Sequence, residues 1–250
     1  MTDTVSSKNP RYILGTVTPV GVNLLPMSQP QPLLPDDILR IVSTLNLTDY
    51  TEERVQEAID HRYWKCVDDL MQQGAQSITL AGFPVSAQLS RDRVLELLEK
   101  TRQKTGVTVD THAEASVAAL KHFGARRIAV ASRWSKPLND LVVAYLQHAG
   151  FEVLTITSVG QWAQQAFSMS IEEGVKLAFQ LGRQAMKQAP DAQALFLAGG
   201  AWRSLAAVPI LEEDFKIPVV TNPITQPWRL MAAGVAPYVQ GWGRLLAGQS

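Results

Sequence analysis

The stretch Ala194-Leu-Phe-Leu-Ala-Gly-Gly-Ala-Trp-Arg203 decides the fold that the sequence predicts. Its apolar first half is typical of a buried strand, and Gly199 and Gly200 end that strand in a polar, aromatic turn. An earlier stretch repeats the pattern: Ala75-Gln-Ser-Ile-Thr-Leu-Ala-Gly82 matches Ala192-Gln-Ala-Leu-Phe-Leu-Ala-Gly199 at its Ala-Gln start and its Leu-Ala-Gly end. Two similar strand ends, one in each half of the chain, indicate a duplicated α/β unit.

The remaining sequence alternates short apolar runs with helical patterns, which favours parallel sheets covered by helices on both faces. We expect strands at 12–18, 41–47, 77–80, 107–109, 127–131, 153–156, 194–197 and 218–220. We expect helices at 51–70, 91–104, 113–123, 171–188, 205–215 and 226–233, with another that ends at residue 148 and a short one capped by Asp36 and Asp37.

This alternation predicts an α/β protein of two pseudo-symmetric parallel-sheet lobes. The first lobe would contain residues 1–118 and 222–250, and the second would contain residues 119–221. Ligands bind at the carboxyl ends of parallel strands, so the site is expected in the cleft between the lobes.

Composition narrows the class of protein. At 250 residues the chain is long enough for one large domain or two small lobes. Its 23 Lys and Arg side chains balance 23 Asp and Glu side chains, so no charge excess indicates nucleic acid or an anionic membrane. There is no apolar signal segment, and no apolar run approaches the roughly 18 residues that span a bilayer. We expect a cytoplasmic protein without a nucleic-acid or membrane partner; its oligomeric state is open, a homo-oligomer included.

Familiar catalytic motifs are missing. The sequence has no glycine-rich dinucleotide fingerprint, no phosphate-binding loop, no paired-histidine zinc helix and no nucleophile elbow. The four histidines, His61, His112, His122 and His148, are scattered without a carboxylate at ligand spacing. Cys66 is the single cysteine, which excludes an internal disulfide framework and a multi-cysteine metal site. We therefore expect no metal and no cofactor.

Several stretches keep one order along nearly the whole chain. They are Gly15-Thr-Val-Thr-Pro19, Gln73-Gly74, Leu120-Lys-His-Phe-Gly-Ala-Arg-Arg-Ile-Ala-Val130, Asn139, Gly199-Gly200, Ile217-Pro-Val-Val-Thr-Asn222 and Gly241-Trp-Gly-Arg-Leu245. Together they resemble the arylmalonate decarboxylase and maleate cis–trans isomerase branch of the aspartate/glutamate racemase superfamily. The resemblance implies two lobes around a closed pocket, with a cysteine acid/base at one or both of two strand ends. A thiol suits that chemistry because it exchanges a proton near neutral pH.

This sequence departs from the pattern that it resembles. The second cysteine position falls on Ala198, and the first falls on Ala81 or Gly82. Neither alanine nor glycine can give or take a proton. Cys66 lies inside an amphipathic helical pattern before the strand, where a plain core role is expected. The resemblance thus implies the fold and the pocket, whereas the thiol chemistry is lost.

Asp110 and His112 are the candidate catalytic residues, since they follow the strand 107–109. A histidine there could serve as general acid or base. The alternative is structural: His112 would merely start the next helix, and Asp110 would cap it.

Cations after two strand ends would suit a carboxylate substrate. Arg133 and Lys136 follow the strand 127–131, and Arg203 ends the stretch quoted at the start. For each of them, the alternative is a solvated surface position.

Aromatic residues also follow the strand ends. Phe83, Trp134 and Trp202 would form a flat-walled apolar pocket if they converge. The alternative is that they pack the interface between the lobes. The remaining candidate substrate contacts are small polar or backbone groups of the strand-end loops, namely Thr18, Asn23, Gly82, Ala198, Gly199, Gly200, Thr221 and Asn222. The resemblance assigns the asparagines to a carboxylate, and the amides of Gly199 and Gly200 could form one wall of an oxyanion site.

The sequence therefore predicts a cysteine-independent, lyase-like enzyme with decarboxylase, isomerase or elimination chemistry on a small carboxylate, aromatic ones included. In an apolar pocket, desolvation would favour loss of a carboxylate while donors stabilise the remaining charge. The proton would come from His112, a bound water or the substrate. The alternative function is a catalytically silent homologue that binds a small carboxylate.

Overall fold

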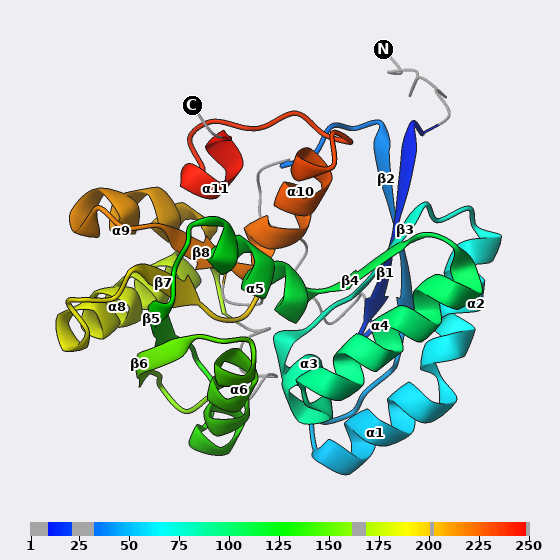
Figure 1. The fold of residues 1–250 in the computed structure, drawn as a ribbon, viewed down its shortest axis with the longest axis horizontal. Helices are drawn as coiled ribbons and strands as arrows, with labels where there is room; N and C mark the ends of the chain where they lie inside the picture. Colours follow the sequence, from blue (N-terminus) through cyan, green and yellow to red (C-terminus); the bar gives the residue numbers. More distant parts are fainter. Residues whose placement is uncertain (1–9, 22–32, 162–168, 201–202, 249–250) are drawn as a thin grey trace.

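Two four-stranded sheets form the frame of the molecule (Figure 1). The structure, a computed structural model, describes residues 10–21, 33–161, 169–200 and 203–248. The first sheet has the order β2-β1-β3-β4 and the second has the order β6-β5-β7-β8, with every neighbouring pair parallel. The strands are β1 (Tyr12–Thr18), β2 (Ile38–Thr44), β3 (Ser77–Leu80), β4 (Thr108–Thr111), β5 (Arg127–Ala131), β6 (Glu152–Thr157), β7 (Ala194–Leu197) and β8 (Val219–Thr221).

The two sheets share one topology, in which each strand of the first corresponds to the strand four places later in the second. The internal repeat falls on corresponding strands, β3 and β7, next to the centre of each sheet. Both strands are wholly buried, as the apolar runs predict. The expected α/β fold with two parallel sheets is confirmed.

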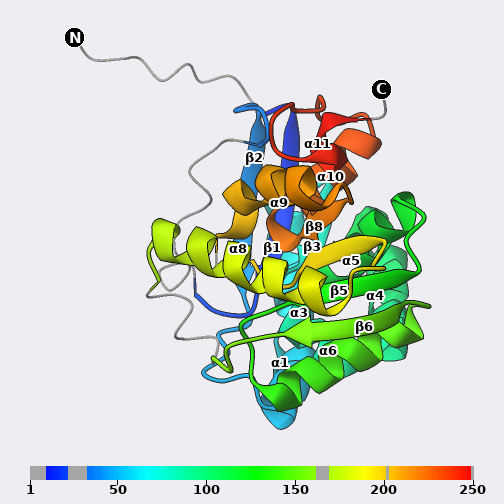
Figure 2. The ribbon, with the colours of Figure 1, turned by 90° about the vertical axis from the view of Figure 1, so that its left-hand side faces the viewer.

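Helices cover the sheets and fill the space between them. They are α1 (Glu52–His61), α2 (Tyr63–Gln72), α3 (Phe83–Leu89), α4 (Arg91–Thr105), α5 (His112–His122), α6 (Lys136–His148), α8 (Ile171–Gln188), α9 (Ala207–Phe215), α10 (Asn222–Ala232) and α11 (Arg244–Ala247), with a 3₁₀ turn at Ser204–Ala206. Figures 1 and 2 show α1 to α4 beside the first sheet and α6, α8 and α9 beside the second. Helices α5 and α10 pack together between the two sheets. None of the described helices is both long and apolar enough to cross a bilayer.

The alternation of side chains along β7 divides the core into two parts. Phe196 belongs to a large cluster that includes Leu14 and Ile78 of the first sheet, so this part of the core is continuous between the lobes. Leu195 and Leu197 point to the other face, into a cluster formed with α8 and α9.

Five features of the structure differ from the sequence expectations. Asp36 and Asp37 do not cap a helix, because β2 begins at Ile38; β2 also ends at Thr44, three residues before the expected strand end. The helix expected at 51–70 is divided at Arg62 into α1 and α2. Helix α3 was not expected; Pro84 lies in its first turn, where the missing proline N–H has no helical partner to lose. For the same reason Pro223 lets α10 start at Asn222, four residues earlier than predicted.

Candidate functional site

One chain of hydrogen bonds joins strand ends of both sheets. At the end of β3, the Gly82 N–H donates to Nδ1 of His112 over 3.3 Å. At the end of β7, the Gly199 N–H donates to Oδ1 of Asn222 over 2.6 Å. The Asn222 amide then donates to Oγ of Ser116 (2.9 Å) and to the His112 carbonyl (3.3 Å). The predicted meeting of the two lobes at their strand carboxyl ends is therefore present in the structure.

His112 stands at the start of α5, directly after β4. Thr111 caps this helix, since its hydroxyl accepts the Glu114 N–H at 2.9 Å. The idea that Asp110 caps the helix is therefore wrong, whereas the expectation that His112 starts it holds. The first turn of a helix carries partial positive charge, which disfavours a protonated imidazole at this place.

The contact with Gly82 fixes the protonation state of His112. Because Nδ1 accepts a hydrogen bond, the proton of the neutral ring lies on Nε2. Burial, aided by repulsion from Arg40, lowers the pKa of His112 to about 4. Nε2 has no hydrogen-bond partner in the described part of the chain. At neutral pH the side chain is thus a neutral hydrogen-bond donor and not an imidazolium acid.

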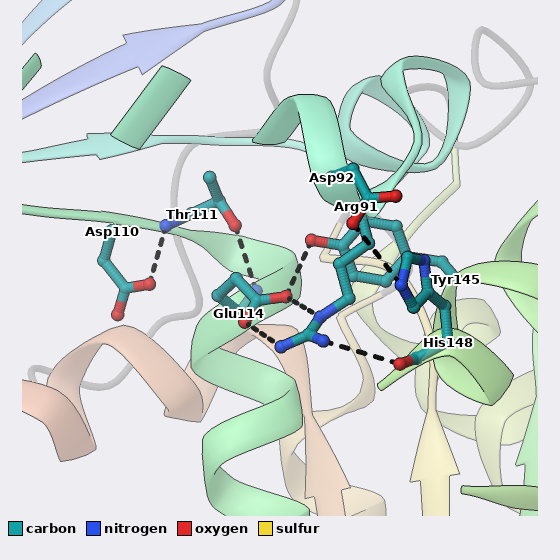
Figure 3. Close-up of polar contacts among 7 residues, drawn as sticks. All are labelled: Arg91, Asp92, Asp110, Thr111, Glu114, Tyr145 and His148. Atoms are coloured by element: carbon teal, nitrogen blue, oxygen red, sulfur yellow. Dashed lines mark hydrogen bonds and ion pairs between the residues drawn. The ribbon is translucent and has the colours of Figure 1, made fainter. Parts of the chain in front are cut away.

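Asp110 faces a different neighbourhood from His112. Its carboxylate pairs with Nε of Arg229 on α10 at 2.7 Å and accepts the Thr111 N–H at 2.8 Å. Figure 3 shows its side chain directed away from the Glu114 carboxylate. Burial raises the pKa of Asp110, and the Arg229 charge opposes that shift. Within the described residues, the Asp110 carboxylate bonds to Thr111 and Arg229 and not to the imidazole of His112.

Arg133 is a buried cation at the end of β5. Its side chain is 3% exposed, and within the described ranges it donates one hydrogen bond, to Oε1 of Gln161 at 3.1 Å. Burial lowers the pKa of Arg133 to about 10, so it stays charged at neutral pH. The undescribed internal segments 22–32, 162–168 and 201–202 contain no Asp or Glu, and the one Asp among the other undescribed residues is Asp3. The alternative of a solvated surface position is therefore wrong for Arg133.

The other two candidate cations differ from each other. Lys136 is exposed and pairs with Asp140 at 2.7 Å, which is the surface role. Arg203 follows β7 in a left-handed conformation with φ of 54°, and its Nε is buried without a partner among the described residues. Arg133 and Arg203 thus place two cations without described carboxylate partners after neighbouring strands of the second sheet.

Phe83 and Trp134, two of the three candidate aromatic residues, lie near each other and pack against other aromatic rings. The ring of Phe83 lies 6.5 Å from Trp134, 5.6 Å from Phe196 and 5.5 Å from Tyr145. Phe83 and Trp134 are both buried, so they fill the interface between the lobes in this structure. Gly199 allows this packing: it has a φ of +111°, and a Cβ there would lie 3.1 Å from the Trp134 ring.

The polar candidates are mostly engaged within the protein. The Thr18 hydroxyl donates to the Val20 carbonyl at 2.9 Å, and the Thr221 hydroxyl donates to the Leu197 carbonyl at 3.0 Å. Both Asn222 amide atoms and the Gly199 amide are used in the bonds described above. Ala198 is buried, Gly82 is partly buried and Gly200 is exposed. Asn23 and Trp202 lie outside the described residues.

Sequence reasoning missed a largely buried ion pair between Arg91 and Glu114, which Tyr145 of the second lobe also contacts (Figure 3). Arg91 of α4 donates two hydrogen bonds to Glu114 of α5, at 2.8 and 3.0 Å. The hydroxyl of Tyr145, on α6 beside the second sheet, donates to the same carboxylate at 2.8 Å. Thr111 and Glu114 have the spacing of a capping box, which could have marked the helix start, but no local pattern identifies Arg91 or Tyr145 as partners.

No group of three or more His, Cys, Asp or Glu residues in the described ranges is arranged to hold a metal ion. Cys66 is buried in α2, where its thiol donates to the Thr44 carbonyl at 3.4 Å. The plain core role expected for it agrees with this placement.

Comparison with known proteins gives consistent matches. The family model for arylmalonate decarboxylase matches residues 14–246. The arylmalonate decarboxylase of Bordetella bronchiseptica is 26% identical over 243 residues, which cover 93% of this chain and 95% of that protein. A solved structure of an arylmalonate decarboxylase double mutant in the liganded form has a TM-score of 0.83 at 25% identity, covering 94% of this chain and 98% of that one. A maleate cis–trans isomerase mutant of Nocardia farcinica, with a covalently bound succinylcysteine intermediate, has a TM-score of 0.79 at 20% identity, covering 96% and 99% of the two chains, and shows the fold alone.

Proposed function

The chain belongs to the arylmalonate decarboxylase family, and we propose that it is a lyase-like enzyme acting on a small carboxylate without a cysteine. Membership of the family supports decarboxylase or isomerase chemistry at the level of the class. The proposed substrates are malonate-type acids, aryl-substituted ones included, bound where the strands of the two sheets end. This location follows the general rule for ligands of parallel sheets.

The single observation that carries the proposal is the buried guanidinium of Arg133. Leaving such a charge without a counter-ion is costly, and a bound carboxylate would remove that cost with bidentate, charge-assisted hydrogen bonds. Arg203, with its unpartnered Nε, would contact a second carboxylate or the same one. A positive charge stabilises the carboxylate that it binds and so disfavours loss of that group as CO₂. Arg133 is therefore proposed to hold the carboxylate that the product keeps.

In the proposed decarboxylation, the bond between the substrate's central carbon and the leaving carboxylate breaks. Carbon dioxide departs, and the electron pair stays as an enediolate whose negative charge lies on the remaining carboxylate oxygens. The Nε2–H of neutral His112 would stabilise one of those oxygens, as a preorganised donor does. A water molecule then supplies the proton to carbon, because His112, with its pKa of about 4, is not an imidazolium at neutral pH. The hydroxide left behind takes a proton from the solvent.

A thiol does not enter this scheme. Cys66 is buried in α2 and bonded to a backbone carbonyl, and the ends of β3 and β7 carry Ala81, Gly82 and Ala198. The thiol proton transfer implied by the resemblance is replaced in the proposal by water and a neutral donor.

Binding without turnover is the second candidate function. Among the described strand-end residues, His112 is the group closest to an acid/base role, and its pKa of about 4 leaves no proton exchange near neutrality. The Phe83 and Trp134 rings also close much of the interface. A silent carboxylate-binding homologue would have these features.

A turnover assay distinguishes the proposed lyase from a protein that only binds a carboxylate. Purified full-length protein is incubated with arylmalonates, maleate and hydroxy acids, and substrate loss and CO₂ release are followed. Decarboxylation that is weakened in His112→Ala supports the lyase proposal. If no acid is consumed while the acids raise the melting temperature, the binding function replaces the enzymatic one. Unchanged kcat in His112→Ala would remove this residue from the mechanism.

A further inference from the structure

The turn that carries Arg133, between β5 and α6, is held by a buried polar network. The Ser132 hydroxyl donates to Oδ1 of Asn139 over 2.6 Å and accepts the Trp134 N–H at 3.2 Å. The Asn139 amide donates in turn to the Trp134 carbonyl at 3.0 Å. Ser132 is fully buried and Asn139 is 4% exposed. Asn139 therefore ties α6 to the residues on both sides of Arg133.

The segment after β6 holds the same turn from its other side. The Gln161 N–H donates to the Arg133 carbonyl, and the Ser158 hydroxyl donates to the Trp134 carbonyl at 2.7 Å. The peptide unit between Arg133 and Trp134 is thus held at its carbonyl by Gln161 and at its N–H by Ser132. A held peptide plane limits rotation of the Arg133 backbone, and so it sets the direction in which the side chain leaves the turn.

The guanidinium itself is held less firmly than the backbone that carries it. Arg133 has five N–H donors, and within the described ranges one of its nitrogens, Nη1, bonds to a single acceptor, Gln161. One bond does not fix the plane of a guanidinium. The aim of this buried cation therefore depends mainly on the turn, and through the turn on Asn139.

The helix does not explain why an asparagine occupies position 139. Asparagine is a weak helix former and is mostly exposed in proteins, whereas Asn139 lies in the second turn of α6 among buried residues such as Leu138 and Val142. Its Oδ1 and Nδ2 atoms both bond to the turn. A leucine of similar size would fill the same space and could make neither bond.

We propose that Asn139 is a positioning residue for Arg133, acting through the Ser132 hydroxyl and the Trp134 carbonyl. This inference rests on the proposed function, in which Arg133 binds the carboxylate that the product keeps. A rigid turn presents the guanidinium in the orientation for bidentate contact, so the ligand does not have to order it on binding. Loss of Asn139 leaves the charge in the site but removes its fixed direction.

The test compares binding of phenylacetate with binding of phenylacetamide, its neutral isostere, by calorimetry on the full-length protein. Phenylacetate has the one carboxylate that decarboxylation of phenylmalonate leaves, so binding is measured without turnover. The wild type is expected to prefer the acid by about 10- to 100-fold, the effect of charge-assisted hydrogen bonds. Asn139→Leu should reduce this preference about three- to tenfold, while its Kd for phenylacetamide stays within about twofold of the wild type.

Three further variants serve as controls. Gln147→Leu, at an exposed position of the same helix, should leave both Kd values unchanged. Arg133→Met should abolish the preference for the acid. Ser158→Ala removes one bond to the Trp134 carbonyl from an exposed residue, so it should fold and should also reduce the preference. It decides the question if Asn139→Leu does not fold.

The outcomes separate this inference from the function on which it rests. A purely structural role of Asn139 would weaken binding of the acid and the amide equally, or change neither. Either result, in a protein whose preference is abolished by Arg133→Met, overturns the positioning role alone. A preference that survives Arg133→Met, or a wild type that shows none, overturns the carboxylate role of Arg133 and the positioning role with it.

Discussion

Arg133 and His112 illustrate how burial changes the chemistry of single residues. A guanidinium removed from water without a carboxylate loses hydration that Gln161 alone cannot replace. The imidazole of His112 is held neutral by burial and by the Gly82 N–H. In the proposed site, Arg133 would supply a permanent positive charge and His112 a neutral hydrogen-bond donor; both suit an anion, and neither moves a proton at neutral pH.

Arg133→Met should separate binding from stability. Loss of charge-assisted hydrogen bonds to the substrate, worth roughly 1.5–3 kcal/mol, should raise KM about 10- to 100-fold. Replacement of an unpaired buried cation by an apolar side chain of similar length should leave the free energy of unfolding unchanged or about 1 kcal/mol higher. Steady-state kinetics and urea unfolding measure the two effects. A large loss of stability with normal KM would show that Arg133 has a purely structural role.

The depressed pKa of His112 makes stability depend on pH. In the unfolded chain its pKa is near 6.5, and in the folded chain it is about 4, so the unfolded state binds the additional proton between these values. The stabilisation is complete above pH 6.5 and is lost as pH falls toward 4, by up to about 3 kcal/mol. Urea unfolding of the wild type and His112→Gln across this range should show a shallower slope in the variant. Equal slopes would contradict the neutral, buried state.

The sequence predicted the positions of site residues along the chain better than it predicted their burial and protonation. Sequence placed His112 and Arg133 after strand ends because apolar strand runs and turns are visible locally. It could not show that Arg133 is buried or that Gly82 holds Nδ1, since both depend on contacts between distant segments.

At the scale of elements, α5 and α10 connect the site to the core. Each begins at the carboxyl end of a strand, after β4 and β8, and the two pack together between the sheets (Figure 1). Asn222, the first residue of α10, ties them by bonding to Gly199 of the second lobe and to Ser116 of α5.

Asn222→Asp should loosen this junction. The carboxylate can still accept from Gly199, but it cannot donate to Ser116 or to the His112 carbonyl, and it buries a charge. We expect a loss of about 2–4 kcal/mol in the free energy of unfolding. Asn46→Asp, at an exposed position, is the matched control and should change stability by less than about 0.5 kcal/mol. Similar effects of the two substitutions would rule out the bridging role.

Elements with complete local signals were predicted best. Helix α8 spans the expected 171–188, because its apolar period is long and Ser170 forms a capping box with Glu173. Strands β1 and β5 also have the expected bounds. The break at Arg62 and the short α3 carry no strong local signal, so sequence missed both.

At the scale of the whole molecule, the lobes share the larger part of the core, and the Tyr145 hydroxyl links the ion pair of Arg91 and Glu114 to α6. The repeat of Ala75–Gly82 in Ala192–Gly199 predicted the duplicated topology, since corresponding sequence marks corresponding strands. The contact of Arg91, Glu114 and Tyr145 between the lobes could not be predicted, because it joins three helices far apart in sequence (Figure 3).

Glu114→Gln tests this connection. It leaves Arg91 largely buried without its counter-ion, so the free energy of unfolding should fall by about 2–4 kcal/mol. Glu99→Gln removes an exposed pair with Arg102 and should cost no more than about 1 kcal/mol. Urea unfolding followed by tryptophan fluorescence compares them. Equal costs would show that the Arg91–Glu114 pair, with its Tyr145 contact, contributes no more to stability than an exposed pair.

Release of CO₂ from arylmalonates by Cys66→Ala, a protein with no cysteine at all, tests the thiol-free reaction most directly. Cys66 lies in α2 and outside the proposed chemistry, so kcat/KM should stay within about twofold of the wild type. A folded Cys66→Ala variant that has lost a wild-type decarboxylase activity would contradict the proposed mechanism.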